Sequence, residues 1–309
     1  MIFICRKNLS SETCLRTIRH VSHLCMKGLI LKINCPDQHG IVAKVASYVA
    51  DYAGNLVEFS QFTDDQNGKF FARVEIDTTD LSVDVDDFVK GFETLGKSLQ
   101  AAWHFRHQPY KMRTAVLVTK TDHCLNEILW RTKLGEMPIE ITSIIGNRDA
   151  CKSIADNAGI PFHHVDMDGE KKAEGFQKIR DLLLDQKVEL TVLARFMQIL
   201  PDWFCQEFGG KIINIHHSFL PAFIGANPYR QAYERGVKLI GATCHYVTSD
   251  LDAGPIIEQE VQRVQHFHSP QDLIRLGRDC ERNAIARGIR YHVNDRTIIH
   301  KNRAIVFPD

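Results

Sequence analysis

Three side chains near the end of one apolar segment have types and spacing that suit acyl-group chemistry. Asn214 and His216 lie two residues apart in the segment IINIHH, so both project from the same face of a strand. An amide beside an imidazole can donate hydrogen bonds to an oxygen on which negative charge develops. Asp252, in the segment SDLDAG, is a third group that can orient the imidazole or activate water. A histidine at a strand end is often structural instead, so these residues alone leave both interpretations open.

Alternating strands and helices from Arg113 onward must position these residues. Apolar runs such as RTAVLVTK and ELTVLA, separated by amphipathic segments, are typical of a parallel sheet covered on both faces. We therefore expect a Rossmann-like, mostly parallel α/β domain over residues 113–309, closed by a long helix that starts near Pro270. Ligands of such sheets bind outside the carboxyl ends of the strands, which is where IINIHH ends.

A smaller domain is predicted over residues 28–107, with residues 108–112 as its linker to the larger one. Its pattern gives the order β-α-β-β-α-β, which is the ferredoxin-like unit. Gly54 is the expected C-terminal stop of the first helix. One face of that helix should be apolar, formed by Ile41, Val45, Tyr48, Val49 and Tyr52.

Residues 1–27 form a basic N-terminal extension. They carry Arg6, Lys7, Arg16, Arg19 and Lys27 against the single acid Glu12. This bias is typical of an organellar transit peptide, while a basic tail or a true start at Met26 stays open. We expect a cytoplasmic protein, or a mitochondrial one if the extension is a transit peptide.

The overall charge argues against several classes of partner. Lys+Arg and Asp+Glu are each 38, so the net charge is zero and nothing favours nucleic acid or an anionic membrane as the partner. No apolar run approaches the roughly 20 residues that cross a bilayer. We therefore expect a soluble protein.

The cysteines and histidines do not show metal-ligand spacing. Nine cysteines are scattered without a C-x-x-C pair, which favours reduced, mostly buried thiols over disulfides or structural zinc. Neighbouring histidines on a strand, as in His163-His164 and His216-His217, point to opposite faces and cannot easily chelate together. The pair His266-x-His268 has no companion ligand, and we expect no metal and no cofactor.

The larger domain resembles the folate-dependent formyltransferase family from Arg113 to Phe307. The matching runs include VLVTKTDHCLNEILWRTKLGEMPIEI, VLARFMQIL and IINIHHSFLPAFIGANPYRQAYERGVKLIGATCHYVTSDLDAGPIIEQEV. The run CPDQHGIVAKVASYVADYAGNLVEFSQFTD resembles the start of an ACT domain, a module that binds small ligands, often amino acids. An ACT domain ahead of this catalytic domain is the arrangement of the deformylase branch of the family. The resemblance implies hydrolysis of 10-formyltetrahydrofolate to tetrahydrofolate and formate, which balances one-carbon pools and supplies formate for purine synthesis.

The resemblance also implies roles for single residues. The family's catalytic Asn, His and Asp fall on Asn214, His216 and Asp252. His217 stands where the family usually has proline, and Ile224 stands where lysine is common. The implied folate pocket consists of Phe196, Met197, Gln198, Ile199 and Leu200 on one side and Val247, Asp250 and Gly254 on the other.

The small domain has two possible roles. Asp37, His39 and Gly40 would form part of a regulatory site for an amino acid, glycine or methionine being the candidates, because backbone N–H groups at a helix N-terminus suit a carboxylate. Alternatively, the domain serves only to join copies of the chain through sheet edges. A homo-oligomer is expected in either case.

Three other functions compete with hydrolysis. Glycinamide ribonucleotide transformylase would need a glycine-rich phosphate loop, whereas the corresponding segment TKTDHCLN has no glycine. A methionyl-tRNA formyltransferase would carry a further C-terminal domain and a basic surface, but this chain stops at Asp309 with zero net charge. An inactive folate or amino-acid sensor would not need all three catalytic groups. Water is therefore the expected acceptor of the formyl group.

Overall fold

The computed structural model describes residues 28–220 and 228–309, so residues 1–27 and Ile224 lie outside the described residues. The chain divides into two compact units, Met1–Tyr110 and Lys111–Asp309.

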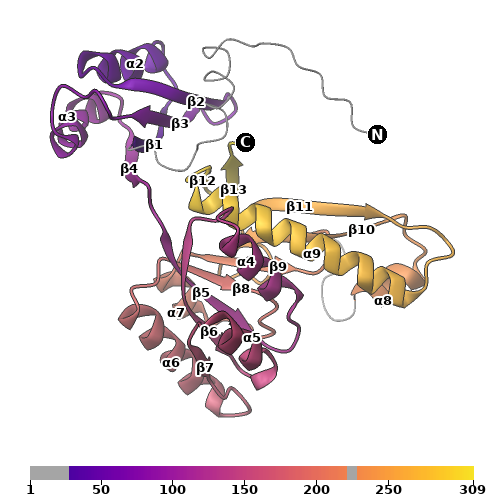
Figure 1. The fold of residues 1–309 in the computed structure, drawn as a ribbon. Helices are drawn as coiled ribbons and strands as arrows, with labels where there is room; N and C mark the ends of the chain where they lie inside the picture. Colours follow the sequence, from indigo (N-terminus) through magenta and orange to yellow (C-terminus); the bar gives the residue numbers. More distant parts are fainter. Residues whose placement is uncertain (1–27, 221–227) are drawn as a thin grey trace, which may run out of the picture. The chain divides into compact units, whose positions relative to one another are not determined.

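The first unit is a four-stranded antiparallel sheet with two helices (Figure 1). The strand order is β2-β3-β1-β4, and the ferredoxin-like prediction is confirmed. Its elements in chain order are β1 (Gly28–Pro36), α2 (Ile41–Asp51), β2 (Asn55–Asp64), β3 (Lys69–Asp77), α3 (Val85–Ser98) and β4 (Ala102–Gln108).

Helix α2 buries the predicted apolar face, but it does not end as expected. The face packs into the core through Ile41, Val45 and Val49, with Tyr48 and Tyr52 partly buried beside them. The helix ends at Asp51, and Ala53, not Gly54, adopts the left-handed backbone with φ 58°. Gly54 is needed for close packing, because a Cβ there would lie 2.8 Å from Cγ1 of Val49. The prediction of Gly54 as the helix stop is therefore wrong.

The second unit contains a seven-stranded mixed sheet of order β11-β10-β9-β8-β5-β6-β7. The pairs among β5 to β9 are parallel, whereas β10 pairs antiparallel with both β9 and β11. This arrangement confirms the Rossmann-like, mostly parallel fold. Its elements up to the end of the sheet are β5 (Met112–Val118), α4 (His123–Lys133), β6 (Ile139–Gly146), α5 (Lys152–Ala158), β7 (Phe162–His164), α6 (Lys171–Asp185), β8 (Leu190–Leu193), α7 (Asp202–Glu207), β9 (Ile212–His216), α8 (Pro228–Glu234), β10 (Leu239–Tyr246) and β11 (Ile256–Arg263).

Helices cover both faces of this sheet. The chain reverses direction across the sheet after β7, and right-handed crossovers then place α6 and α7 on the face opposite α4 and α5. Phe176 of α6 and Phe204 of α7 pack with Ala115 and Leu117 of β5 in one buried cluster. The long helix α9 (Pro270–Val293) packs against α4 and strands β9 to β11 (Figure 1).

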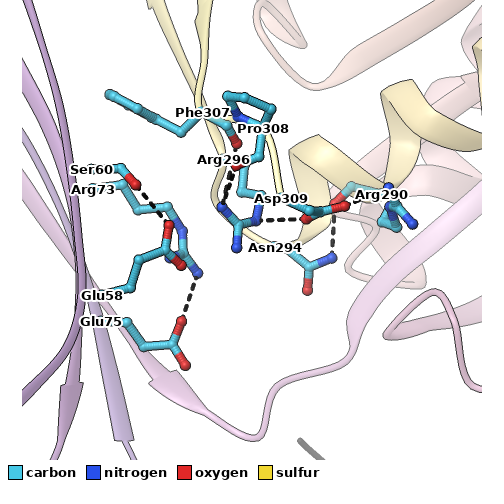
Figure 2. A network of polar contacts seen from close by, with 10 residues as sticks. All are labelled: Glu58, Ser60, Arg73, Glu75, Arg290, Asn294, Arg296, Phe307, Pro308 and Asp309. Carbon is cyan, nitrogen blue, oxygen red and sulfur yellow. Dashed lines mark hydrogen bonds and ion pairs between the residues drawn. The ribbon is translucent and has the colours of Figure 1, made fainter. Parts of the chain in front are cut away.

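A C-terminal hairpin, β12 (Thr297–His300) and β13 (Arg303–Val306), follows α9 and was not predicted. Figure 2 shows the contacts that fasten this end: Nε of Arg296 lies 3.0 Å from Oδ1 of Asp309, which also pairs with Arg290. Arg296 further donates from Nη1 to the carbonyl oxygen of Pro308 at 3.1 Å. The last residues of the chain are therefore tied to α9.

Figure 2 also shows a charged network that belongs to the first unit. Arg73 of β3 is 2% exposed, and its guanidinium lies 3.0 Å from Glu58 and 3.2 Å from Glu75. Two carboxylates thus offset one buried cation within the sheet.

In the part of the chain that the structure describes, no helix combines the length and apolarity that a membrane crossing requires.

Candidate active site

The structure brings the three predicted catalytic residues together at the end of β9. Asn214 and His216 lie on this strand, and Asp252 lies in the turn between β10 and β11. Oδ2 of Asp252 is 3.2 Å from Nδ1 of His216, and its Oδ1 is 3.7 Å from Nε2 of His245. One carboxylate therefore faces two imidazoles.

His245 also lies at this site and was not predicted from the sequence. It lies on β10 directly opposite Asn214 in the antiparallel register. Its Nδ1 is 2.9 Å from the carbonyl oxygen of Tyr246, which can only accept, so Nδ1 carries a proton. Burial holds the pKa of His245 below its ordinary value, although the Tyr246 carbonyl and Asp252 oppose this shift. The ring is therefore neutral and Nε2 is an acceptor.

This tautomer fixes the orientation of the Asn214 side chain. Nδ2 of Asn214 is 3.2 Å from Nε2 of His245 and must donate to it. The amide nitrogen still has a second N–H to offer a ligand. His245 of the neighbouring strand β10 thus fixes the Asn214 side chain as a hydrogen-bond donor.

Asp252 is held as an anion that orients His216. Burial raises the pKa of its carboxyl, but the hydrogen bond from His216 and the nearby histidines outweigh burial and bring the pKa below its ordinary value. The Asp252 backbone adopts the left-handed region with φ 53°, a conformation that costs energy outside glycine. With Nδ1 of His216 directed at Asp252, Nε2 is buried and has no hydrogen-bond partner among the described residues. Nε2 is therefore the His216 atom available to a substrate.

A cavity of about 500 Å³ lies against these residues. It is lined by Asn214, His216, His245 and Asp252. Most of the predicted folate-pocket residues also line it, namely Phe196, Met197, Gln198, Ile199, Leu200, Val247 and Asp250. The volume is in the ordinary range for a small-molecule site.

Gly254 does not line this cavity, contrary to prediction. A Cβ at this position would lie 1.9 Å from the carbonyl oxygen of Tyr246. Gly254 therefore lets the Asp252 turn approach β10 and acts through the backbone. The contact of Gly254 with folate stays a prediction.

The cavity rim exposes apolar side chains. Met197, Ile199 and Leu251 are 56%, 60% and 60% exposed. The backbone N–H of Met197 is held by the Thr119 hydroxyl at 3.0 Å, which fixes the loop after β8. Exposed apolar side chains beside convergent polar groups suit a flat aromatic ligand with a polar edge.

A second buried polar cluster, here called the Glu281 cluster, consists of His123, Arg195, Tyr229 and Glu281. Nε2 of His123 lies 2.8 Å from Oε2 of Glu281, the Tyr229 hydroxyl donates to Oε1 at 2.7 Å, and Nε of Arg195 is 3.5 Å from Oε2. Burial raises the pKa of Glu281, but these partners outweigh burial and lower it overall. Glu281 is therefore a buried carboxylate with partners on three sides.

The Glu281 cluster is a poor metal site despite its residue types. Ligand atoms of His123, Cys124 and Glu281 lie within 4.8 Å of one another. However, burial raises the pKa of Cys124 well above its ordinary value, so the thiol keeps its proton and is a weak ligand. The guanidinium of Arg195 beside Glu281 would also repel a cation. The cluster therefore does not suit a metal ion.

The predicted regulatory residues line a separate cavity of about 460 Å³ in the first unit. Asp37, His39 and Gly40 contribute to it at the N-terminus of α2, where no acidic side chain occupies the first turn. Gln61 and Thr63 of β2 also line it and were not predicted. Unoccupied N–H groups at a helix N-terminus suit a carboxylate.

Comparisons with known proteins agree with this division into two units. Residues 112–289 match the family model of formyl transferases, and residues 29–90 match the ACT domain. A formyltetrahydrofolate deformylase from Synechocystis sp. is 46% identical over 277 residues, which are 90% of this chain and 97% of that protein.

Solved structures separate two branches of the formyl transferases. The crystal structure of a formyltetrahydrofolate deformylase from Pseudomonas syringae pv. tomato has a TM-score of 0.92 and 40% identity, and it covers 96% of this chain and 100% of its own. Glycinamide ribonucleotide transformylase 1 from Symbiobacterium toebii has a TM-score of 0.62 and 30% identity, and covers 65% of this chain and 97% of its own. Of these two structures, the deformylase is the one that covers nearly the whole of this chain. The chain belongs to the formyltetrahydrofolate deformylase family.

Proposed function

We propose that this chain hydrolyses 10-formyltetrahydrofolate to tetrahydrofolate and formate, with Asn214, His216 and Asp252 as the catalytic residues. The observation that carries the proposal is the contact between His216 and Asp252 beside a donor amide on the wall of one cavity. Relatives named formyltetrahydrofolate deformylase support the choice of substrate. The substrate-binding residues we propose are those of the cavity rim, Phe196–Leu200 with Val247 and Asp250.

The geometry supports a direct attack of water on the formyl carbon. Asp252 orients the imidazole and accepts a proton from water as the C–O bond forms. The second N–H of Asn214 and protonated Nε2 of His216 donate to the formyl oxygen as it gains negative charge. When the C–N10 bond breaks, His216 passes its proton to N10, and the formyl carbon leaves as formic acid. Formic acid loses its proton to solvent and becomes formate, and the proton that Asp252 took from water returns to His216, which resets the site. We propose no cofactor.

Product analysis tests this proposal. The purified protein is incubated with 10-formyltetrahydrofolate alone, and formate and tetrahydrofolate are measured together. Equal release of both without an amine supports hydrolysis. Turnover only after glycinamide ribonucleotide is added would show a transferase instead. Absence of turnover in both assays would favour the sensor function.

We also propose that the cavity at the start of α2 binds an amino acid, glycine or methionine, and regulates the enzyme. The helix N-terminus would hold the carboxylate, and Gln61 and Thr63 offer polar groups for the remainder. Thermal unfolding with each amino acid tests this, with Gln61→Ala as the variant. Stabilisation of the wild type that is lost in Gln61→Ala supports the site, and no stabilisation by either amino acid refutes it.

Assembly and location are further parts of the proposal. Strands β2 and β4 are the edges of the first sheet, and Val57 and Phe62 of β2 are 40% and 39% exposed, so pairing of such edges would give a homo-oligomer. Light scattering that finds a monomer would refute this. The free thiols of all described cysteines support a reducing compartment, the cytoplasm.

A further inference from the structure

Arg195 provides a cation at the wall of the catalytic cavity that the hydrolysis described above does not use. We propose that Arg195 holds the carboxylate of formate, the anionic product, and that Glu281 positions Arg195 for this. The inference rests on the proposed function, because that reaction creates a small carboxylate inside the cavity.

The guanidinium of Arg195 has N–H donors that no described residue accepts from. The side chain is 16% exposed, and Nε and Nη1 are buried without a hydrogen-bond partner among the described residues. Its nearest anion, Oε2 of Glu281, lies 3.5 Å from Nε, which is an ion-pair distance but too long for a good hydrogen bond. Buried donors without acceptors are unfavourable, so a small anion that reached Nη1 would gain strong charge-assisted contacts.

Glu281 is fixed by two partners other than Arg195. His123 contacts Oε2 at 2.8 Å and Tyr229 contacts Oε1 at 2.7 Å, so both carboxylate oxygens already have short partners. Glu281 thus compensates the charge of Arg195 without taking a short hydrogen bond from it. The backbone of Arg195 adopts φ 64°, an unfavourable conformation for arginine that the surrounding loop must impose. Both features hold the guanidinium in one place.

The charges of the cavity explain why a cation is needed there. With its proton returned to His216, Asp252 is again an anion, so it repels a formate ion that is still bound beside it. Among the described residues that line the cavity, Arg195 is the one with a permanent positive charge. The neighbouring His217 does not help, because burial and Arg195 lower its pKa to about 4 and leave it neutral. Arg195 is therefore the group that can accommodate the product's charge.

Formate binding in the absence of folate tests the proposal directly. The full chain is titrated with ¹³C-formate and binding is followed by NMR line broadening, for the wild type and for Arg195→Met. We expect Arg195→Met to weaken formate binding about tenfold or more, the loss typical of a charge-assisted hydrogen bond. Arg195→Lys keeps the charge and should lose less. Arg180→Met, which removes an arginine paired with Glu207 on the surface of α6, is the matched control and should bind as the wild type does.

A second variant separates product binding from a purely structural role. Asp252→Asn removes the repelling charge and should tighten formate binding. This effect is opposite in sign to the weaker binding expected for Arg195→Met. If Arg195→Met fails to fold, Arg195→Gly replaces it, because glycine suits the positive φ. Formate binding that is equal in folded Arg195 variants and the wild type would overturn the proposal.

Failure of the formate-binding proposal can be distinguished from failure of the proposed function. Formate binding needs no turnover, whereas hydrolysis is scored by product release. If the chain hydrolyses its substrate but the Arg195 variants bind formate as the wild type does, only the role of Arg195 is refuted. Arg195-dependent formate binding without hydrolysis supports a carboxylate site and refutes the proposed function.

Discussion

Nδ1 of His216 lies 3.2 Å from Oδ2 of Asp252, and this contact determines which atom of the imidazole faces the cavity. The carboxylate comes from a turn 36 positions along the chain, and that turn is held by the close approach of Gly254 to β10. The site therefore depends on backbone packing as well as on its catalytic side chains.

Asp252→Asn should abolish most of the activity with little change in fold. The amide keeps the size of the carboxyl but cannot accept a proton, so we expect kcat to fall about 10²- to 10⁴-fold. Steady-state formate release measures this. Asp181→Asn on the exposed surface of α6 is the control. A fall of less than threefold in Asp252→Asn would show that the carboxylate has no part in catalysis.

His245→Phe should lower kcat about tenfold or more, with a smaller effect on KM, because Asn214 loses the acceptor that orients its amide. His245→Gln offers an oxygen to the same amide and should recover part of the rate. Kinetics of both variants give the kcat and KM values. Equal loss in both variants would mean that His245 acts otherwise than through Asn214.

Gly254→Ala should destabilise the protein by about 3 kcal/mol and reduce activity, because the new Cβ would meet the Tyr246 carbonyl at 1.9 Å. Urea unfolding gives the free energy. Gly236→Ala is the control: it has φ 62° and no atom within 4 Å of its Cβ, so only backbone strain of about 1 kcal/mol is expected. A similar loss in the free energy of unfolding for Gly254→Ala and Gly236→Ala would contradict the packing role of Gly254.

Protonation of His217 should lower the stability of the protein as the pH falls. Burial and Arg195 lower the pKa of His217 from 6.5 to about 4, so the unfolded chain binds this proton first. Its contribution to the free energy of unfolding is fully present above pH 6.5 and is lost as the pH falls to about 4. The loss is on the order of 3 kcal/mol.

Urea unfolding between pH 7 and 4 measures this contribution. His217→Gln should flatten the pH dependence, whereas His266→Gln, which removes an exposed histidine, is the control. An unchanged slope in His217→Gln would show that His217 titrates alike in the folded and unfolded chain.

Local patterns in the sequence predicted much of the fold. Helix α9 begins at Pro270, as predicted, because Ser269 and Asp272 form a capping box and Pro270 suits the first turn. Strands β2 and β3 coincide with the alternating runs NLVEFSQFTD and KFFARVEID, which the glycine-containing segment DQNG separates. The short hairpin of β12 and β13 was missed because its strands have only four residues each.

Long-range pairings explain what could not be predicted at the site. His245 meets Asn214 through the antiparallel register of β10, and nothing local to either residue shows that register. Arg195 and Glu281 are far apart in sequence and meet only when α9 packs on the sheet. The roles of Asn214, His216 and Asp252 came from the family resemblance, and the structure adds their mutual geometry.

The most direct test of the central claim is hydrolysis of 10-formyltetrahydrofolate in H₂¹⁸O without any amine acceptor. Direct attack of water predicts one ¹⁸O atom in each formate released, in step with tetrahydrofolate, and loss of this signal in Asp252→Ala. Absence of labelled formate, with the formyl group passed on only when an amine is supplied, would contradict the assignment of this site to hydrolysis.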